Sequence, residues 1–95
     1  MKQLVSSWEE FMRKPFPSNL AGENINGVDL VEVDSYTAGC ITTYIETKGT
    51  LDQEHKKILK KCLEEIQAVI PLLKNEEQKY FSMLFSIGNT VIKGM

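Results

Sequence analysis

The 95-residue chain has little of what would assign it to a class at once. It contains two cysteines, three prolines, one histidine and one tryptophan. Two cysteines are too few for a disulfide-dependent secreted scaffold, and Cys40 and Cys62 match no zinc or redox spacing. No apolar run approaches the ~20 residues that a membrane-spanning helix needs. These absences argue against a disulfide-rich secreted domain, a zinc module and an integral membrane protein.

The charge balance also excludes a class of partner. The chain has 11 basic and 13 acidic side chains, a net charge of −2. Residues 1–48 carry four basic and seven acidic groups, a net of −3, and residues 49–95 carry seven and six, a net of +1. A general nucleic-acid binder normally has an isoelectric point above about 9. The charge balance therefore argues against nucleic acid as a partner, and any attraction to phosphate would have to be local.

What remains is the composition of one globular domain. Hydrophobic residues make up 42% and charged residues 25%, both near the average for such domains. Both cysteines lie within apolar helical patterns, so we expect buried free thiols in a reducing cytoplasm. A disulfide between them is the alternative that the sequence leaves open.

Apolar residues recur at helical spacing in four segments, and short connections separate most of them. We therefore predict an all-α, single-domain four-helix bundle with antiparallel neighbours. An ordered loop over 15–26 is the one long connection. The predicted helices span about 2–14, 28 or 35–47, 51–70 and 76–93.

The start of the second helix is ambiguous. Val28, Val31 and Val33 are β-branched and fit a short strand, whereas a longer frame through Leu30 fits a helix. A strand here would lack a partner, because no other segment has a strand pattern. The sequence leaves open whether 28–34 is helical or extended.

Capping patterns set the other boundaries. Thr50 with Gln53, and Asn75 with Gln78, both have the spacing of a capping box, which predicts helix starts at these positions. Pro71 is expected either to kink the third helix or to end it near Val69.

Two glycines fall inside predicted helices. Glycine in a helix interior is about 1 kcal/mol less favourable than alanine. We therefore predict that Gly39 and Gly88 are each required by close packing of a neighbouring helix.

The most concentrated charge is a group of lysines at the start of the third helix. Residues four apart share a helix face, which pairs Lys56 with Lys60 and Lys57 with Lys61. We consider these four lysines a candidate docking face for an acidic partner; a solvated face is the plainer interpretation. Asp29, Glu32 and Asp34 form a second, acidic candidate face, which capping and solvation would also explain.

No catalytic set follows from the remaining residues. His55 lies off the apolar stripe, and no nucleophile or carboxylate is predicted to face it. No metal-ligand pattern or Gly-rich phosphate loop is present. We therefore expect no enzymatic activity, no metal and no cofactor.

The function predicted from this sequence is that of a small soluble protein-interaction module. Such a module would be an adaptor, inhibitor, immunity-type or regulatory protein, whose partner is another protein or a second copy of the chain. The alternatives are a helical bundle that binds a small ligand between its helices and a nucleic-acid-associated regulator.

Overall fold

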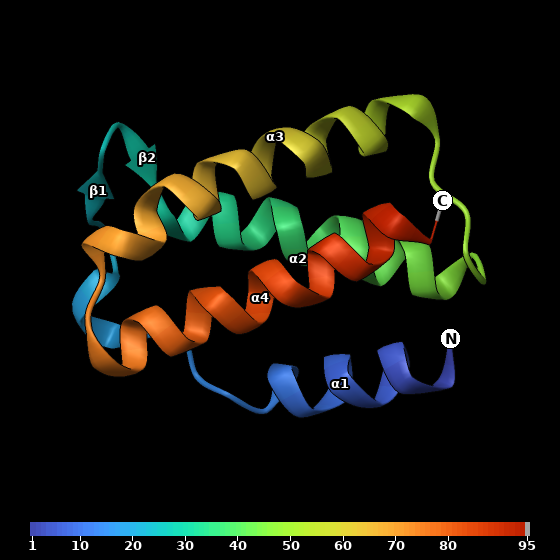
Figure 1. Ribbon diagram of the computed structural model, residues 1–95, viewed down its shortest axis with the longest axis horizontal. Helices are drawn as coiled ribbons and strands as arrows, with labels where there is room; N and C mark the ends of the chain where they lie inside the picture. The colour runs from blue at the N-terminus through green and yellow to red at the C-terminus, as the bar shows by residue number, and fades with distance from the viewer. Residues whose placement is uncertain (95) are drawn as a thin grey trace.

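The computed structural model of this protein describes residues 1–94 and contains four main helices (Figure 1). A short two-stranded hairpin and two 3₁₀ turns complete it. The elements are α1 (Lys2–Met12), η1 (Ser18–Leu20), β1 (Asn24–Ile25), β2 (Val28–Asp29), α2 (Leu30–Glu46), α3 (Gln53–Val69), η2 (Ile70–Leu72) and α4 (Asn75–Lys93).

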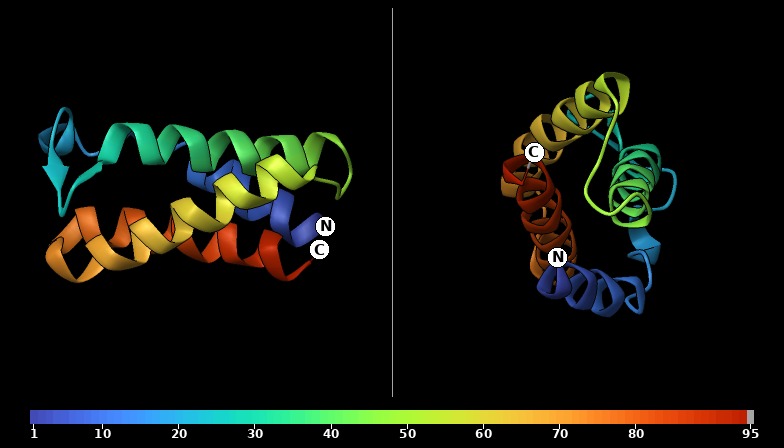
Figure 2. Two further views of the ribbon diagram at one scale, coloured as in Figure 1. Left: turned by 90° about the horizontal axis from the view of Figure 1, so that it is seen from above. Right: turned by 90° about the vertical axis from the view of Figure 1, so that its right-hand side faces the viewer.

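The four helices form the predicted bundle. Helices α2, α3 and α4 run alternately up and down and pack against one another, and α1 lies antiparallel along α4 (Figures 1 and 2). The Cα radius of gyration is 12.7 Å, against about 12.4 Å expected for a compact domain of this length. No helix within residues 1–94 has the length and apolarity to cross a membrane.

The core lies along the faces that the helical spacing predicted. Two aromatic rings of α1, Trp8 and Phe11, stack with their centroids 5.4 Å apart, and Phe11 also contacts Tyr80 of α4 at 4.8 Å. The largest fully buried side chains are Leu30, Thr37, Ile41, Leu59, Ile66, Val69, Phe81, Leu84 and Val91. The buried Thr37 hydroxyl donates to the main-chain oxygen of Val33 at 2.7 Å, so its burial leaves no unpaired donor.

The prediction that a strand at Val28 would lack a partner is wrong, because the ordered loop predicted over 15–26 contains a short strand. Asn24–Ile25 pairs antiparallel with Val28–Asp29, so the strand at Val28 has a partner. Asn26 and Gly27 have φ values of 55° and 79°, the left-handed conformation that a two-residue hairpin turn requires. Both strands are two residues long, which is too short to leave a periodic pattern in the sequence.

Helix α2 begins between the two predicted starts. It starts at Leu30, and the Asp29 carboxylate caps it by accepting a hydrogen bond from the Glu32 amide at 3.1 Å. The residues just before it are extended, so 28–29 are strand and 30–34 are helix.

Both predicted capping boxes are wrong. Helix α3 starts at Gln53 and is capped by Asp52, not Thr50. Helix α4 starts at Asn75 without a side-chain cap, and Gln78 instead donates from Nε2 to the main-chain oxygen of Ile70 at 3.0 Å. In both cases a hydrogen bond to a different nearby acceptor forms in place of the predicted one.

Pro71 ends helix α3. The helix stops at Val69, and Pro71 lies within the 3₁₀ turn that follows, η2. Proline has no amide hydrogen to continue the helical hydrogen bonds, which explains the stop.

The packing prediction holds for one glycine and fails for the other. A Cβ at Gly88 would lie 2.7 Å from Cδ2 of Leu63, so this glycine lets α3 and α4 approach closely. A Cβ at Gly39 would meet no atom within 4 Å, and the residue is exposed. No contact within residues 1–94 explains why a glycine occupies the middle of α2.

Candidate functional site

The lysines at the start of α3 lie on a helix whose opposite side is buried in the core. The buried side of α3 includes Leu59 and Ile66, both fully enclosed by the core. On the opposite side, Lys57, Lys60 and Lys61 are exposed, and Lys56 is half-buried at the edge. We call these four residues the lysine face.

The charges of the lysine face are not neutralised within the part of the chain that the structure describes. Neither the adjacent Glu64 nor Glu65 lies within ion-pair distance of any of the four ammonium groups. Like charges four residues apart on a helix oppose helix formation by about 0.2–0.5 kcal/mol per pair. The lysine face is therefore a positive surface on a molecule whose net charge is negative.

The structure does not bring the three predicted acidic residues together. The Asp29 side chain caps α2, and Glu32 extends from the first turn of that helix. Asp34 turns towards α4 and accepts a hydrogen bond from the Tyr80 hydroxyl at 2.8 Å. Asp34 thus lies apart from Asp29 and Glu32, which are neighbours at the start of α2.

Asp34 and Tyr80 form a polar contact between α2 and α4. Burial raises the pKa of the Asp34 carboxyl, and the hydrogen bond from Tyr80 offsets part of that rise. Burial, followed by the neighbouring carboxylate, raises the pKa of Tyr80 well above its usual value. Tyr80 also packs against the rings of Phe16 and Phe81, at 5.7 and 5.2 Å. Its hydroxyl and ring are both engaged in holding the fold.

A different pair of carboxylates shares a surface hollow. Glu32 and Glu65 line a hollow of about 340 Å³ beside the hairpin, together with Asp29 and the exposed ring of Tyr36. We call Asp29, Glu32 and Glu65 the acidic hollow. The sequence reasoning missed Glu65, because it comes from α3 and joins the group only through the packing of α3 on α2.

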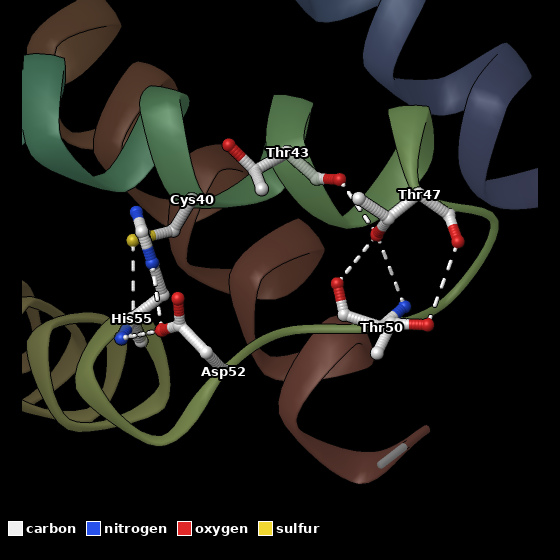
Figure 3. Close-up of polar contacts among 6 residues, drawn as sticks. All are labelled: Cys40, Thr43, Thr47, Thr50, Asp52 and His55. Carbon is white, nitrogen blue, oxygen red and sulfur yellow. Dashed lines mark hydrogen bonds and ion pairs between the residues drawn. The ribbon is translucent and has the colours of Figure 1, made fainter.

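The connection between α2 and α3 holds the most concentrated polar network (Figure 3). The Asp52 carboxylate accepts from the His55 amide at 2.8 Å, and the same oxygen lies 2.8 Å from Nδ1 of the His55 ring. The Thr47 hydroxyl lies between the main-chain oxygen of Thr43 at 2.9 Å and the amide of Thr50 at 3.2 Å. These bonds fix the end of α2 and the start of α3.

Cys40, His55 and Asp52 lie close together here, but their contacts are those of a helix cap. The Cys40 thiol donates to the main-chain oxygen of His55 at 3.7 Å, not to its ring. Cys40 is 2% exposed, and burial, the nearby Cys62 and Asp52 all raise its thiol pKa. A raised pKa keeps the thiol protonated, whereas a nucleophile must be a thiolate. The Asp52–His55 contact was also missed from the sequence, although the three-residue spacing of aspartate and histidine at a helix start was its signal.

A groove lies between the 14–19 segment and α4. It has a volume of about 770 Å³ and is open to solvent. Pro15, Phe16 and Pro17 form one wall, and Tyr80 and Met83 form part of the other. Its charged residues are of both signs, and Asn19 donates to Glu77 across it. The lining of the groove is mostly apolar, and its charged residues have no single sign.

Within residues 1–94, no three histidine, cysteine or acidic side chains lie together in a way that could hold a metal ion. Comparison of the chain with protein-family models, curated proteins and solved structures gave no match.

Proposed function

We propose that this protein is an interaction module whose lysine face docks a carboxylate-rich surface of a partner protein. The observation that carries the proposal is the lysine face itself: three exposed cations within five residues, held on a rigid helix and facing solvent. The protein has no catalytic role of its own in this proposal. Its two buried, free thiols fit a reducing compartment such as the cytoplasm.

Electrostatics explains how such a face would act. Exposed charges contribute little to stability, but complementary charges steer a partner during diffusion and select its orientation. Because α3 is anchored by its buried side, the lysine backbone positions are set before binding. Docking then requires ordering of the lysine side chains only, not of the helix.

A protein partner fits the surface better than a nucleic acid does. Binding to single-stranded bases normally combines basic and aromatic side chains, and no aromatic residue lies among Lys56, Lys57, Lys60 and Lys61. The overall charge of −2 would also oppose approach to a polyanion, whereas a local acidic surface only needs to match α3.

The test is site-specific photo-crosslinking in the host cell from a crosslinking residue placed at Lys60. We expect an adduct of defined mass, whose yield falls about tenfold or more in the variant Lys57→Glu/Lys61→Glu and falls with rising salt in the purified complex. The matched control is Lys2→Glu/Lys93→Glu, which changes the net charge equally at two exposed positions elsewhere.

The proposal fails if no adduct forms. It also fails if the adduct yield is unchanged in Lys57→Glu/Lys61→Glu, or if the control variant lowers the yield to the same extent.

The groove beside Phe16 favours a second candidate function, the binding of a small apolar ligand. Its volume of about 770 Å³ falls within the range of small-molecule sites, and its lining is mostly apolar. Native mass spectrometry of protein purified gently from its host distinguishes the two functions. A retained small mass that Phe16→Ala releases supports ligand binding, whereas a bare chain or a protein complex counts against it.

A further inference from the structure

We infer that the groove between the 14–19 segment and α4 binds a small molecule with an aromatic body and one negatively charged group, such as an aromatic carboxylate. This inference rests on the second candidate function, ligand binding in the same groove, and names the chemical class of the ligand. Three features of the groove carry it: the proline-flanked wall, the side chains that contact a ring and the pairing of its charged residues.

The wall formed by Pro15, Phe16 and Pro17 has its shape before a ligand arrives. Proline fixes its own φ and disfavours helical backbone in the residue before it, so Pro17 favours an extended Phe16. The Phe16 ring packs on α4, with its centroid 5.7 Å from that of Tyr80 and 6.1 Å from that of Phe81. A preformed wall lowers the conformational entropy that binding would otherwise lose.

The apolar side chains of the groove suit a flat ring. Phe16 is half-buried, so part of its ring remains open beside the groove. It is nearly perpendicular to the rings of Tyr80 and Phe81, at 81° and 88°, an arrangement that aromatic groups favour. Met83 is also half-buried, and a thioether makes favourable contacts with aromatic rings. An aromatic ligand would therefore contact Phe16 on one wall and Met83 on the other.

The charged side chains of the groove indicate the charge of the ligand. Lys79 lies 3.4 Å from Glu76 on the same helix, and Glu77 accepts a hydrogen bond from Asn19 across the groove. Lys14 is the remaining charged residue of the lining, and no acidic side chain within residues 1–94 lies within ion-pair distance of its ammonium group. The charge without a partner is positive, so a ligand that complements the groove is an anion.

The two parts of such a ligand act differently. Removal of its ring from water provides most of the affinity, because the lining is mostly apolar. The ion pair with Lys14 lies at an exposed rim, where it contributes modestly to affinity but orients the ligand. A cation in the same position would face Lys14 and find both carboxylates of the groove already engaged.

The test is a titration of the full chain with three naphthalene probes that carry their substituent at the same ring position: naphthoate, naphthylmethanol and naphthylmethylammonium. Two-dimensional NMR of the backbone amides measures each affinity and identifies the residues that the probe approaches. We expect naphthoate to bind about threefold or more tightly than the neutral probe and the cation to bind most weakly, with shifts confined to 14–19 and 76–83. The affinity for naphthoate should fall as salt rises.

Two variants separate the ring contact from the charge contact. Phe16→Ala is expected to weaken the binding of all three probes about tenfold or more. Lys14→Gln is expected to lower the affinity for naphthoate to that for the neutral probe, whose own affinity stays unchanged. The matched control is Arg13→Gln, which removes an exposed positive charge at a neighbouring residue outside the lining and is expected to preserve the preference for naphthoate.

The outcomes separate this inference from the functions proposed above. Equal binding of the three probes in the groove overturns the inference but leaves ligand binding as a candidate function. Shifts outside 14–19 and 76–83, or an undiminished affinity of Lys14→Gln for naphthoate, also overturn it. If naphthoate does not bind, the inference fails, and native mass spectrometry still decides the candidate function. Docking at the lysine face is tested separately, by the crosslink from position 60.

Discussion

Gly39 and Gly88 show how surroundings decide the effect of a single residue. Both lie in helix interiors, where the backbone entropy of glycine is unfavourable. At Gly88 the absence of a side chain leaves room for Leu63, which a Cβ would contact closely. At Gly39 the space beside the backbone is open. The two sites therefore predict opposite responses to a larger side chain.

Gly88→Leu is expected to lower the free energy of unfolding by about 1–3 kcal/mol, because the larger side chain must displace Leu63. Gly88→Ala is expected to be near neutral, since the gain in helix propensity offsets a small shift of the flexible Leu63 end. Urea denaturation followed by circular dichroism measures both. Equal, small effects of the two substitutions would contradict the close packing of α3 on α4.

Gly39→Ala is the matched control, measured in dilute solution. Alanine at this exposed helical position is expected to raise the free energy of unfolding by about 0.5–1 kcal/mol. A loss of stability at Gly39 would show that the open space beside it is filled in the folded monomer.

Asp34 predicts a pH dependence of stability. Its carboxyl has a pKa raised by burial above the ordinary 3.8, so the folded state favours the protonated form. The resulting stabilisation is fully present below the unfolded-state pKa and is lost as pH rises through the higher folded-state pKa. Ionised Asp34 is therefore unfavourable to folding at neutral pH.

Asp34→Asn should remove this dependence, because the amide does not titrate and its oxygen can still accept from the Tyr80 hydroxyl. We expect the variant to gain stability relative to the natural chain as pH rises from 3 to 7. Urea denaturation at a series of pH values measures the difference, in which the other carboxylates cancel. Parallel stability curves for the two proteins would contradict a raised Asp34 pKa.

At the scale of the element, the helices follow the apolar period closely but their ends do not follow local patterns. The buried side of α3 matches its predicted apolar stripe from Leu59 to Val69. Its start was predicted from a Thr–Gln capping box, yet Asp52 provides the cap. Thr50 was a plausible cap by residue type, but its main chain lies in the connection fixed by Thr47.

Asp52→Ala is expected to lower the thermal midpoint by a few degrees, because it removes the hydrogen bond to the His55 amide at the start of α3. Gln53→Ala is the control and should have almost no effect, since Gln53 provides no cap. Thermal unfolding followed by circular dichroism compares them. A larger effect of Gln53→Ala would contradict the Asp52 cap and support the predicted Thr50–Gln53 capping box.

The same cap has a pH signature. The main-chain hydrogen bond from His55, and then the contact with its ring, lower the pKa of Asp52 from 3.8. This contribution is present above the unfolded-state pKa and is lost as pH falls through the lowered folded-state value. Its sign is thus opposite to that of Asp34, and Asp52→Asn separates the two contributions.

At the scale of the whole molecule, the α2–α3 interface connects the core to the candidate surfaces. Cys40 and Cys62 lie within this interface, 2% and 4% exposed, and burial is the largest cause of the raised pKa of both thiols. The same packing places Glu65 beside Glu32 and turns the lysine face outwards. The polar surface pattern is therefore a consequence of how two helices meet.

Both thiols are expected to react with a thiol reagent at one shared, slow rate, because each becomes accessible only when the interface opens. In denaturant both should react at once. Reaction progress followed by absorbance measures this, with Cys40→Ala and Cys62→Ala assigning the rates. A thiol that reacts at the rate of a free cysteine in the native protein would contradict the close packing of this interface.

The candidate site was predictable only in part. Lys56, Lys57, Lys60 and Lys61 share one helix, and the helical period alone places them on a common side. Glu65 joins Glu32 and Tyr36 in the acidic hollow from a different helix, and no periodicity within one segment relates it to them. Asp34 was predicted beside Asp29 and Glu32 by proximity in sequence, but the helical turn points it towards Tyr80 instead.

The number of helices and the buried sides of most of them were predictable from the sequence alone, and Pro71 limited the third helix to either a kink or an end. These properties depend on apolar spacing and proline chemistry, which act within one segment. Tertiary structure decided the hairpin partner of Val28, the role of Gly88, the open surroundings of Gly39 and the acidic hollow. Each of these depends on side chains distant in sequence meeting in space, and the distances between them are set by how the helices pack.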